Sequence, residues 1–210
     1  MKLQQVLGQP ARVLRYLFTE RSYARYYSAE TWEEKFRQGY DLDTTAEDGR
    51  YGALLALMQR YDRGDGLLDA GCGDGLLANR YRPLSRSHLV GLDYSNRAIE
   101  KAKARGLTGC DFHCTDYRDF RTEERFSVVV FNEALYYVED VLGVVHALQP
   151  VLRDGGVFIV SMFDTRVTAR IWNTLRTHLE IVQGVRVHDE GSGLSWRIRV
   201  LRPLRPGVHG

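Results

Sequence analysis

A glycine-rich stretch, Leu67 to Gly75, constrains the fold of this chain more than any other segment. Two leucines lead to Asp69, glycines occupy positions 71, 73 and 75, and the apolar run Leu76-Leu77-Ala78 follows. Glycine tolerates φ angles above zero and lets a ligand approach bare backbone, and a helix begins with N–H groups that lack partners within the helix. The pattern therefore predicts a buried strand, a tight turn and a helix, with a ligand against the turn.

The spacing of these glycines distinguishes the turn from a phosphate-binding one. Here it is D-x-G-x-G-x-G, whereas the dinucleotide fingerprint is G-x-G-x-x-G. The negative charge of Asp69 is unfavourable for a pyrophosphate and favourable for an ammonium group.

From this stretch onward, strand-like segments alternate with segments of helical periodicity, which predicts a parallel α/β sheet. The expected strands are residues 66–70, 88–93, 110–115, 125–131 and 157–163. The expected helices are residues 76–81, 95–105, 138–152 and 165–178, the third of them ending at Asp154-Gly155-Gly156. Two β-prone runs, 179–189 and 194–201, flank a glycine-bearing link, so we expect the sheet to end in antiparallel pairing.

The first part of the chain is expected to form a helical arm or lid. Tyrosines alternate there with arginines, a pattern found in nucleic-acid-binding segments but also where arginine side chains lie along a packed helix. We favour packing or a substrate lid. The expected organisation is an arm at residues 1–50, one α/β domain at residues 51–203 and a loose tail at residues 204–210.

Composition excludes several classes of function. The net charge is +2 in 210 residues, with charges of both signs interspersed, so we expect no nucleic-acid partner. Cys72, Cys110 and Cys114 fit a reduced compartment better than a disulfide scaffold, and with only His113 nearby we expect no metal. No apolar run reaches the length of a membrane span, and the start lacks a signal-peptide core. We expect a cytoplasmic protein; the alternative is a membrane-surface segment at residues 10–27.

Three aspartates occupy equivalent positions in the predicted sheet. Asp69, Asp93 and Asp116 each end a predicted parallel strand, at the sheet edge where ligands of open α/β folds bind. Asp93 is placed to accept both hydroxyls of a ribose. Asp116 could accept from an exocyclic amine, with Tyr94 and Tyr117 beside an adenine. One such acid often caps the next helix, but three in register favour a ligand.

Together these motifs resemble class I S-adenosylmethionine-dependent methyltransferases over about residues 50–202. The resemblance rests on residues 69–75, 91–95, 115–117, 131–133 and 152–156. It implies an α/β fold with a Rossmann-like seven-stranded, mostly parallel sheet, an antiparallel last strand, helices on both faces and a helical N-terminal lid.

The resemblance also implies S-adenosyl-L-methionine as cofactor, S-adenosyl-L-homocysteine as product, and no metal. It assigns the amine of the cofactor to Asp69, the ribose to Asp93, the adenine to Asp116 and Tyr117, and the methionine end to Asn132. The full expected cofactor set is Asp69, Gly71, Cys72, Gly73, Gly75, Asp93, Tyr94, Asp116, Tyr117, Asn132 and Arg50, the last as a partner of the cofactor carboxylate. The expected acceptor-side residues are Trp32, Tyr40, Tyr51 and Tyr136.

Methyl transfer needs a base only when the nucleophile arrives protonated. Glu133, just past the expected strand at residues 125–131, is the best-placed acid and is our expected catalytic residue, with a positioning role as the alternative. His146, His178 and His188 fall on helix or hairpin positions and are more typical of surface or core histidines.

The absence of certain sequence motifs limits which molecules can be the methyl acceptor. The expected strand at residues 125–131 is followed by Asn132-Glu133-Ala134-Leu135. Enzymes that methylate base amines carry an Asn/Asp-Pro-Pro-aromatic box there, and no Pro-Cys dipeptide supports cytosine-C5 chemistry. The short link between the last strands leaves no room for an inserted substrate domain. We expect transfer to nitrogen or oxygen of a small-molecule partner, as in small bacterial methyltransferases that include the nodulation-type N-methyltransferases. The alternatives are a protein or RNA acceptor, or a non-catalytic regulator that binds S-adenosylmethionine.

Overall fold

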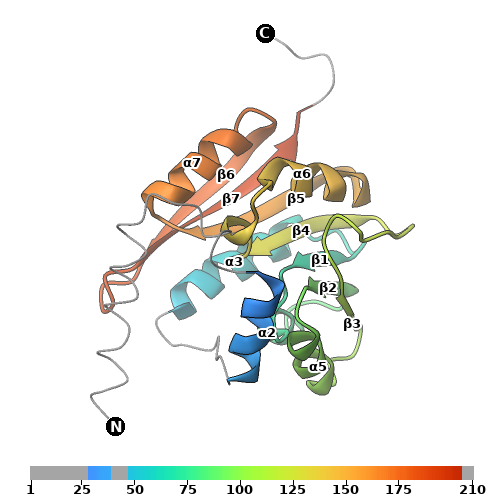
Figure 1. Ribbon diagram of the computed structural model, residues 1–210. Coiled ribbons are helices and arrows are strands. Elements are labelled where there is room, and N and C mark those ends of the chain that lie inside the picture. The colour runs from blue at the N-terminus through green and yellow to red at the C-terminus, as the bar shows by residue number, and fades with distance from the viewer. Residues whose placement is uncertain (1–27, 39–46, 205–210) are drawn as a thin grey trace.

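The computed structural model describes residues 28–38 and 47–204. Within them seven strands form one sheet in the order β3-β2-β1-β4-β5-β7-β6 (Figure 1). The strands are β1 (Leu67–Ala70), β2 (Leu89–Asp93), β3 (Cys110–Cys114), β4 (Phe126–Asn132), β5 (Leu152–Phe163), β6 (Leu179–His188) and β7 (Ser195–Pro203). Neighbours among β1 to β5 pair in parallel, whereas β7 is antiparallel to both β5 and β6. The expected sheet, with its antiparallel strand inserted near the end, is confirmed.

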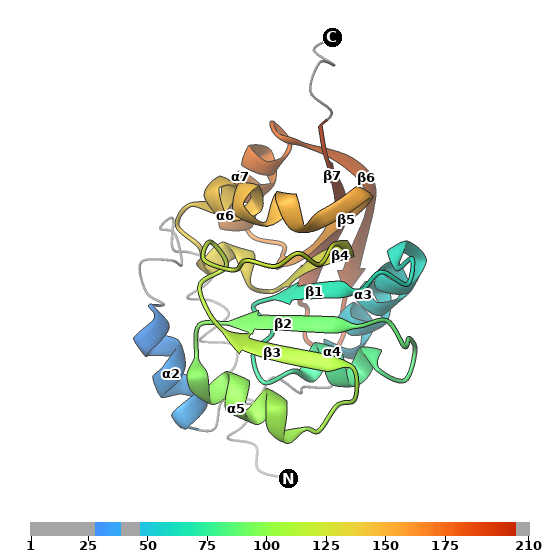
Figure 2. The ribbon, with the colours of Figure 1, turned by 90° about the vertical axis from the view of Figure 1, so that its right-hand side faces the viewer.

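Helices cover both faces of this sheet, as expected. The helical segments are α2 (Ala29–Arg37), α3 (Asp48–Tyr61), α4 (Leu76–Tyr81), α5 (Asn96–Ala104), η3 (Leu135–Tyr137), α6 (Val141–Leu148), η4 (Gln149–Val151) and α7 (Arg166–Leu175). The apolar residues of α6 and α7 pack in one core cluster, and those of α3, α4 and α5 pack in a second cluster on the other face. In Figure 2, α2 lies at the end of the sheet to which β1, β2 and β3 point.

The central strand β4 separates the two cores. All its residues except Asn132 are buried, which explains the continuous apolar run of a strand covered on both faces. Val129 and Phe131 contribute to the α6–α7 core, while Val128 and Val130 contribute to the opposite one. The carboxyl ends of β4 and β1 therefore lie side by side on a well-packed base.

The helix expected at residues 138–152 is shorter than predicted. The Asp140 side chain accepts a 2.8 Å hydrogen bond from the Gly143 N–H and caps the start of α6. Pro150, which has no N–H to donate to a continuing helix, lies in the η4 turn, and β5 begins at Leu152. The segment Asp154-Gly155-Gly156 thus lies inside a strand, and its expected role as a helix stop is wrong.

Asp62, immediately after α3, ties two layers together. Its carboxylate accepts hydrogen bonds from the Gly64 N–H (2.9 Å) and from the hydroxyls of Ser87 (2.9 Å), Tyr81 (2.8 Å) and Ser85 (2.8 Å). Burial alone would raise the pKa of Asp62, but these four donors outweigh burial and lower it.

We expect Asp62→Ala to lower the free energy of unfolding by about 1–3 kcal/mol near neutral pH, because hydrogen bonds to a charged group are lost and the buried Tyr81 hydroxyl loses its acceptor. A lowered pKa stabilises the fold above the ordinary aspartate pKa of about 4, and this stabilisation disappears as the pH falls through the folded-state value. Urea unfolding at neutral and acidic pH measures both effects. Asp119→Ala, at an exposed aspartate, is the control. An equal loss of unfolding free energy in that variant would contradict the stabilising role of Asp62.

Candidate functional site

The glycine-rich turn joins β1 to α4 and is fixed to β2. The N–H groups of Gly71 and Cys72 both donate to the Leu92 carbonyl, at 2.8 and 2.9 Å. Gly71, Gly73 and Gly75 have φ angles of +89°, +55° and +79°. A Cβ at Gly71 would lie 2.4 Å from the Cβ of Ala134, which follows β4. The predicted turn is confirmed, and its first glycine is required by both backbone conformation and close packing.

Asp69 carries a buried carboxylate with no partner. The residue is 1% exposed, and neither oxygen accepts a hydrogen bond in the structure. Burial, together with the negative charge of Asp93, raises the pKa of Asp69 to about 7. A buried carboxylate is unfavourable unless a cation or donor meets it. This position is therefore suited to an ammonium group.

Asp93 ends β2 beside the turn. It accepts 2.9 Å hydrogen bonds from the N–H groups of Gly73 and Ser95. Burial raises its pKa, although these backbone donors oppose the shift. The two contacts fix the carboxylate against the turn while each oxygen retains acceptor capacity, as a ribose ligand requires.

The expected adenine residues lie next along the edge. The rings of Tyr94 and Tyr117 are 4.7 Å apart between centroids. The Tyr117 side chain is buried in the core, and its hydroxyl lies 3.0 Å from the position of a Gly71 Cβ. Asp116 is paired with Arg118 at 2.6 Å, and this contact lowers the pKa of Asp116. Asp116 lies at the expected edge, but its carboxylate already has a cationic partner.

A buried arginine meets the end of β4. Arg50 from α3 is 1% exposed, and its guanidinium donates to Asn132 Oδ1 and to the Glu47 carboxylate. Burial opposes its charge, but Glu133 and Glu47 outweigh this effect and raise the pKa of Arg50. The guanidinium also lies over the Tyr51 ring, 4.4 Å from its centroid. Residues from α3 and β4 are thus brought together as expected.

Glu133 occupies a constrained turn directly after β4. Its φ of +54° makes it the one non-glycine residue with positive φ in the described ranges. Its carboxylate accepts hydrogen bonds from Ser161 Oγ (2.6 Å), Tyr136 Oη (3.1 Å) and the Phe163 N–H (3.1 Å). Burial raises its pKa, opposed by the positive charge of Arg50. Glu133 therefore joins β4, η3 and β5 at the edge of the site.

Helix α2 crosses this edge and is held on two sides. Glu33 accepts a 2.5 Å hydrogen bond from Ser95 Oγ, and Lys101 donates to the Phe36 carbonyl at 3.0 Å. On the other side the Trp32 ring packs edge-on against Tyr137, with 4.9 Å between centroids. Trp32 thus lies close to the η3 turn that contains Tyr136. Tyr40 lies outside the described residues.

One of the expected cofactor residues, Cys72, has its side chain directed into the core. Cys72 packs in the core with the α3, α4 and α5 residues, so only its backbone is available to a ligand. Four further residues of the site were missed: Ser161, Glu47, Ala134 and Glu33. A polar Ser161 within the buried run Ile159 to Met162 was a usable signal, as was Glu47 three positions before Arg50.

Residues 28–38 and 47–204 contain neither a cluster of metal-binding side chains nor a membrane-spanning helix. That part of the chain has no group of three or more His, Cys, Asp and Glu side chains arranged to hold a metal ion. None of its helices combines the length and apolar character that crossing a membrane requires.

Comparison with known proteins identifies similar chains. The family described as "Methyltransferase domain" matches residues 62–193, more than half of this chain. A ubiquinone biosynthesis O-methyltransferase of Bradyrhizobium sp. (strain ORS 278) is 35% identical over 101 residues, which is 47% of this chain and 40% of the relative. Nodulation protein S of Bradyrhizobium diazoefficiens is 34% identical over 106 residues, 48% of this chain and 49% of the relative. The matches thus span half or less of each relative's length.

Crystal structures of other proteins have a similar fold. The crystal structure of N-methyltransferase NodS from Bradyrhizobium japonicum WM9, in complex with S-adenosyl-L-homocysteine, superposes with a TM-score of 0.68. The sequences are 21% identical, and the match covers 83% of this chain and 98% of that one. At this identity the likeness establishes the fold.

Proposed function

We propose that this chain, which belongs to the methyltransferase domain family, transfers the methyl group of S-adenosylmethionine to nitrogen or oxygen of a small-molecule metabolite. The observation that carries the proposal is Asp69, a buried carboxylate without a partner beside a turn of three glycines with positive φ. Phosphate would be repelled there, whereas the ammonium of an amino-acid moiety would be stabilised.

The residues present fit this cofactor. Asp69 would hold the amine, Asp93 the ribose hydroxyls, and the backbone of Gly71, Gly73 and Gly75 would face the ligand. Arg50 is a buried cation at the end of β4, and its Nε has no partner, which supports a role toward the cofactor carboxylate. When bound, S-adenosylmethionine supplies the electrophilic methyl group. The chain must then hold the acceptor in line and exclude water.

The acceptor side is assigned to residues around the end of β4. Trp32 is half-buried, whereas the Tyr51 and Tyr136 rings are buried. Aromatic side chains are typical of the lining of a small-molecule pocket, and we propose that the acceptor binds beside these three. Glu133 is our candidate catalytic residue. Its oxygens already accept three hydrogen bonds of the roughly four that a carboxylate can accept. Only one acceptor site is left to take a proton, which favours a positioning role.

Calorimetry with S-adenosylmethionine and S-adenosylhomocysteine tests the cofactor site. We expect Asp93→Asn to weaken binding about 10- to 100-fold, since hydrogen bonds to a charged group contribute about 1.5–3 kcal/mol. Asp111→Asn is the matched control, because Asp111 lies on β3 and pairs with His88. Unchanged affinity in Asp93→Asn would refute the assignment.

A labelled-methyl screen against amine and hydroxyl metabolites then tests the reaction. For an active acceptor, Glu133→Gln distinguishes two roles: loss of kcat together with its acidic pH limb indicates a base, whereas a raised KM with an unchanged pH profile indicates positioning. Binding without transfer across the whole panel would favour the regulator alternative. Acceptor binding that weakens steeply with salt would favour RNA.

A further inference from the structure

We propose that the sheet face between α7 and the β6–β7 hairpin holds a second binding site, for a phosphate-type oxyanion. The site combines Trp172 of α7 and Arg176 after it with Arg197 and Arg199 of β7 and Arg186 of β6. It is separate from the glycine-rich turn, because β4 and β5 lie between β1 and β7 in the sheet.

Two buried donors without acceptors mark the centre of this site. The Arg199 guanidinium lies over the Trp172 ring, with its Cζ 4.7 Å from the ring centroid. Arg199 Nη1 and Trp172 Nε1 are both buried, and neither donates a hydrogen bond in the structure. Trp172 as a whole is 2% exposed. Buried donors left unpaired are unfavourable, so an oxyanion that accepts from both would be stabilised here.

The surrounding charges are mostly positive. Alternate residues of a strand share a face, so Arg197 and Arg199 lie together, and the register sets Arg186 opposite Arg197. Arg186 and Arg197 share the Asp164 carboxylate, at 2.5 and 2.9 Å. Burial and the positive charges of Arg197 and Arg176 lower the pKa of Arg199, with Asp164 as the opposing charge. The group is therefore rich in guanidinium and short of negative charge.

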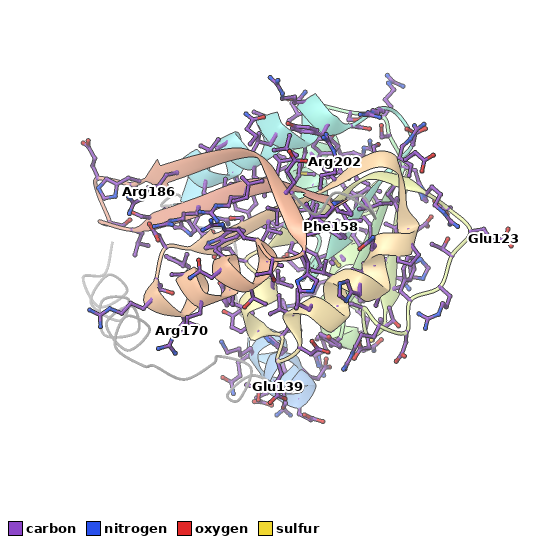
Figure 3. All side chains as sticks on the ribbon, turned by 90° about the horizontal axis from the view of Figure 1, so that it is seen from above. Glu123, Glu139, Phe158, Arg170, Arg186 and Arg202 are labelled. Carbon is purple, nitrogen blue, oxygen red and sulfur yellow. The ribbon has the colours of Figure 1, made fainter. Side chains whose placement is uncertain are left out.

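Arg199 as a residue is half-buried, and there is space beside its side chain. Residue 184, opposite Arg199 in the register, is a glycine, so no side chain of β6 stands beside the guanidinium. In Figure 3, Arg186 lies on the hairpin and Arg170 on the neighbouring helix α7. A guanidinium presents donors in a planar fork that matches phosphate oxygens. The indole N–H is a further, uncharged donor. A compact oxyanion has several oxygens to accept from both groups, so it fits this site better than a monatomic counterion such as chloride.

Indole NMR signals provide a direct test. The chain has three tryptophans. The indole N–H signal that disappears in Trp172→Phe is that of Trp172, and the phenylalanine keeps an aromatic ring at this position. Inorganic phosphate and pyrophosphate are titrated into the full chain against sodium chloride of equal ionic strength. We expect the Trp172 signal to shift saturably with pyrophosphate and with phosphate, and to remain unshifted with chloride. Neither S-adenosylmethionine nor methyl transfer is needed, so the outcome is independent of the proposed activity.

Variants locate the binding. We expect Arg199→Gln to weaken pyrophosphate binding about 10- to 100-fold and Trp172→Phe about 2- to 10-fold, in line with charged and neutral hydrogen bonds. Arg202→Gln, on the same strand but the opposite face, should change affinity less than about twofold. If Arg199→Gln does not fold, Arg199→Lys keeps the charge without the fork, and we expect it to bind more weakly.

The proposal fails if the Trp172 signal does not respond to millimolar pyrophosphate, or if chloride shifts it equally. It also fails if Arg199→Gln, or Arg199→Lys in its place, binds like the unmodified chain.

Discussion

Asp69→Asn is expected to stabilise the unliganded protein at alkaline pH while it weakens the binding of S-adenosylmethionine. Burial raises the pKa of Asp69 to about 7, against about 4 for an ordinary aspartate. Below the ordinary value the carboxyl is neutral in both the folded and unfolded states, so burial of a charge carries no penalty. Between the two values the unfolded chain loses a proton that the folded chain keeps, and stability therefore falls as the pH rises. Above about 7 the penalty is constant.

Each unit between the two pKa values corresponds to about 1.4 kcal/mol, which sets an upper limit of about 4 kcal/mol on the effect. We expect Asp69→Asn to raise the free energy of unfolding by about 1–3 kcal/mol at pH 8. Near pH 4 the variant and the unmodified protein should be almost equal. Urea unfolding across this range measures the difference.

The same substitution should cost at least about tenfold in affinity for S-adenosylmethionine, because the amine loses its charged partner. Binding to the unmodified protein should also strengthen from pH 5 toward pH 7, as Asp69 ionises. A variant that is destabilised at pH 8, or that binds the cofactor with full affinity, would refute the role of Asp69.

Gly71→Ala is expected to lower the free energy of unfolding by about 2–5 kcal/mol and to abolish cofactor binding. An alanine at a φ of +89° carries left-handed strain of about 1–2 kcal/mol. Its Cβ would also lie 2.4 Å from the Ala134 Cβ, and such overpacking adds about 1–3 kcal/mol. The turn must then move away from the end of β4, which separates the Gly71 backbone from its place in the site.

Gly64→Ala is a matched control for this prediction. Gly64 has a nearly equal φ of +86°, but nothing lies within 4 Å of its added Cβ. It should therefore show the backbone strain alone and bind S-adenosylmethionine normally. Thermal unfolding and calorimetry of both variants separate strain from packing. Equal destabilisation of the two would show that the contact with Ala134 contributes nothing.

Much of this fold follows from signals that are local in the sequence. The β1 turn is encoded by glycines at alternate positions, and the buried β4 by a continuous apolar run, so both could be predicted. The inserted β7 was expected from a glycine-bearing hairpin together with the family resemblance. The α6 boundary was not, because it depends on the Asp140 cap and on the pairing of Leu152 with Phe126 across the sheet.

The candidate site divides in the same way. The positions of Asp69 and Asp93 follow from strand ends, which the sequence marks clearly. The pairing of Asp116 with Arg118, the inward Tyr117 ring and the link from Ser161 to Glu133 depend on side-chain directions and on contacts between distant segments. Periodicity carries no information on such contacts. The strained φ of Glu133 likewise has no counterpart in the pattern Asn-Glu-Ala-Leu.

Helix α2 is held to α5 through Glu33 and Ser95, and to the η3 turn through Trp32 and Tyr137. If the cofactor binds at the glycine-rich turn, a helix fastened on both sides of this sheet edge would gate ligand exchange. Spent cofactor would leave after one of these attachments opens, on the timescale of a helix displacement and not of free diffusion. The fastening therefore bears on residence time: a looser α2 would shorten the dwell of substrate and product alike, and turnover could rise even as affinity falls.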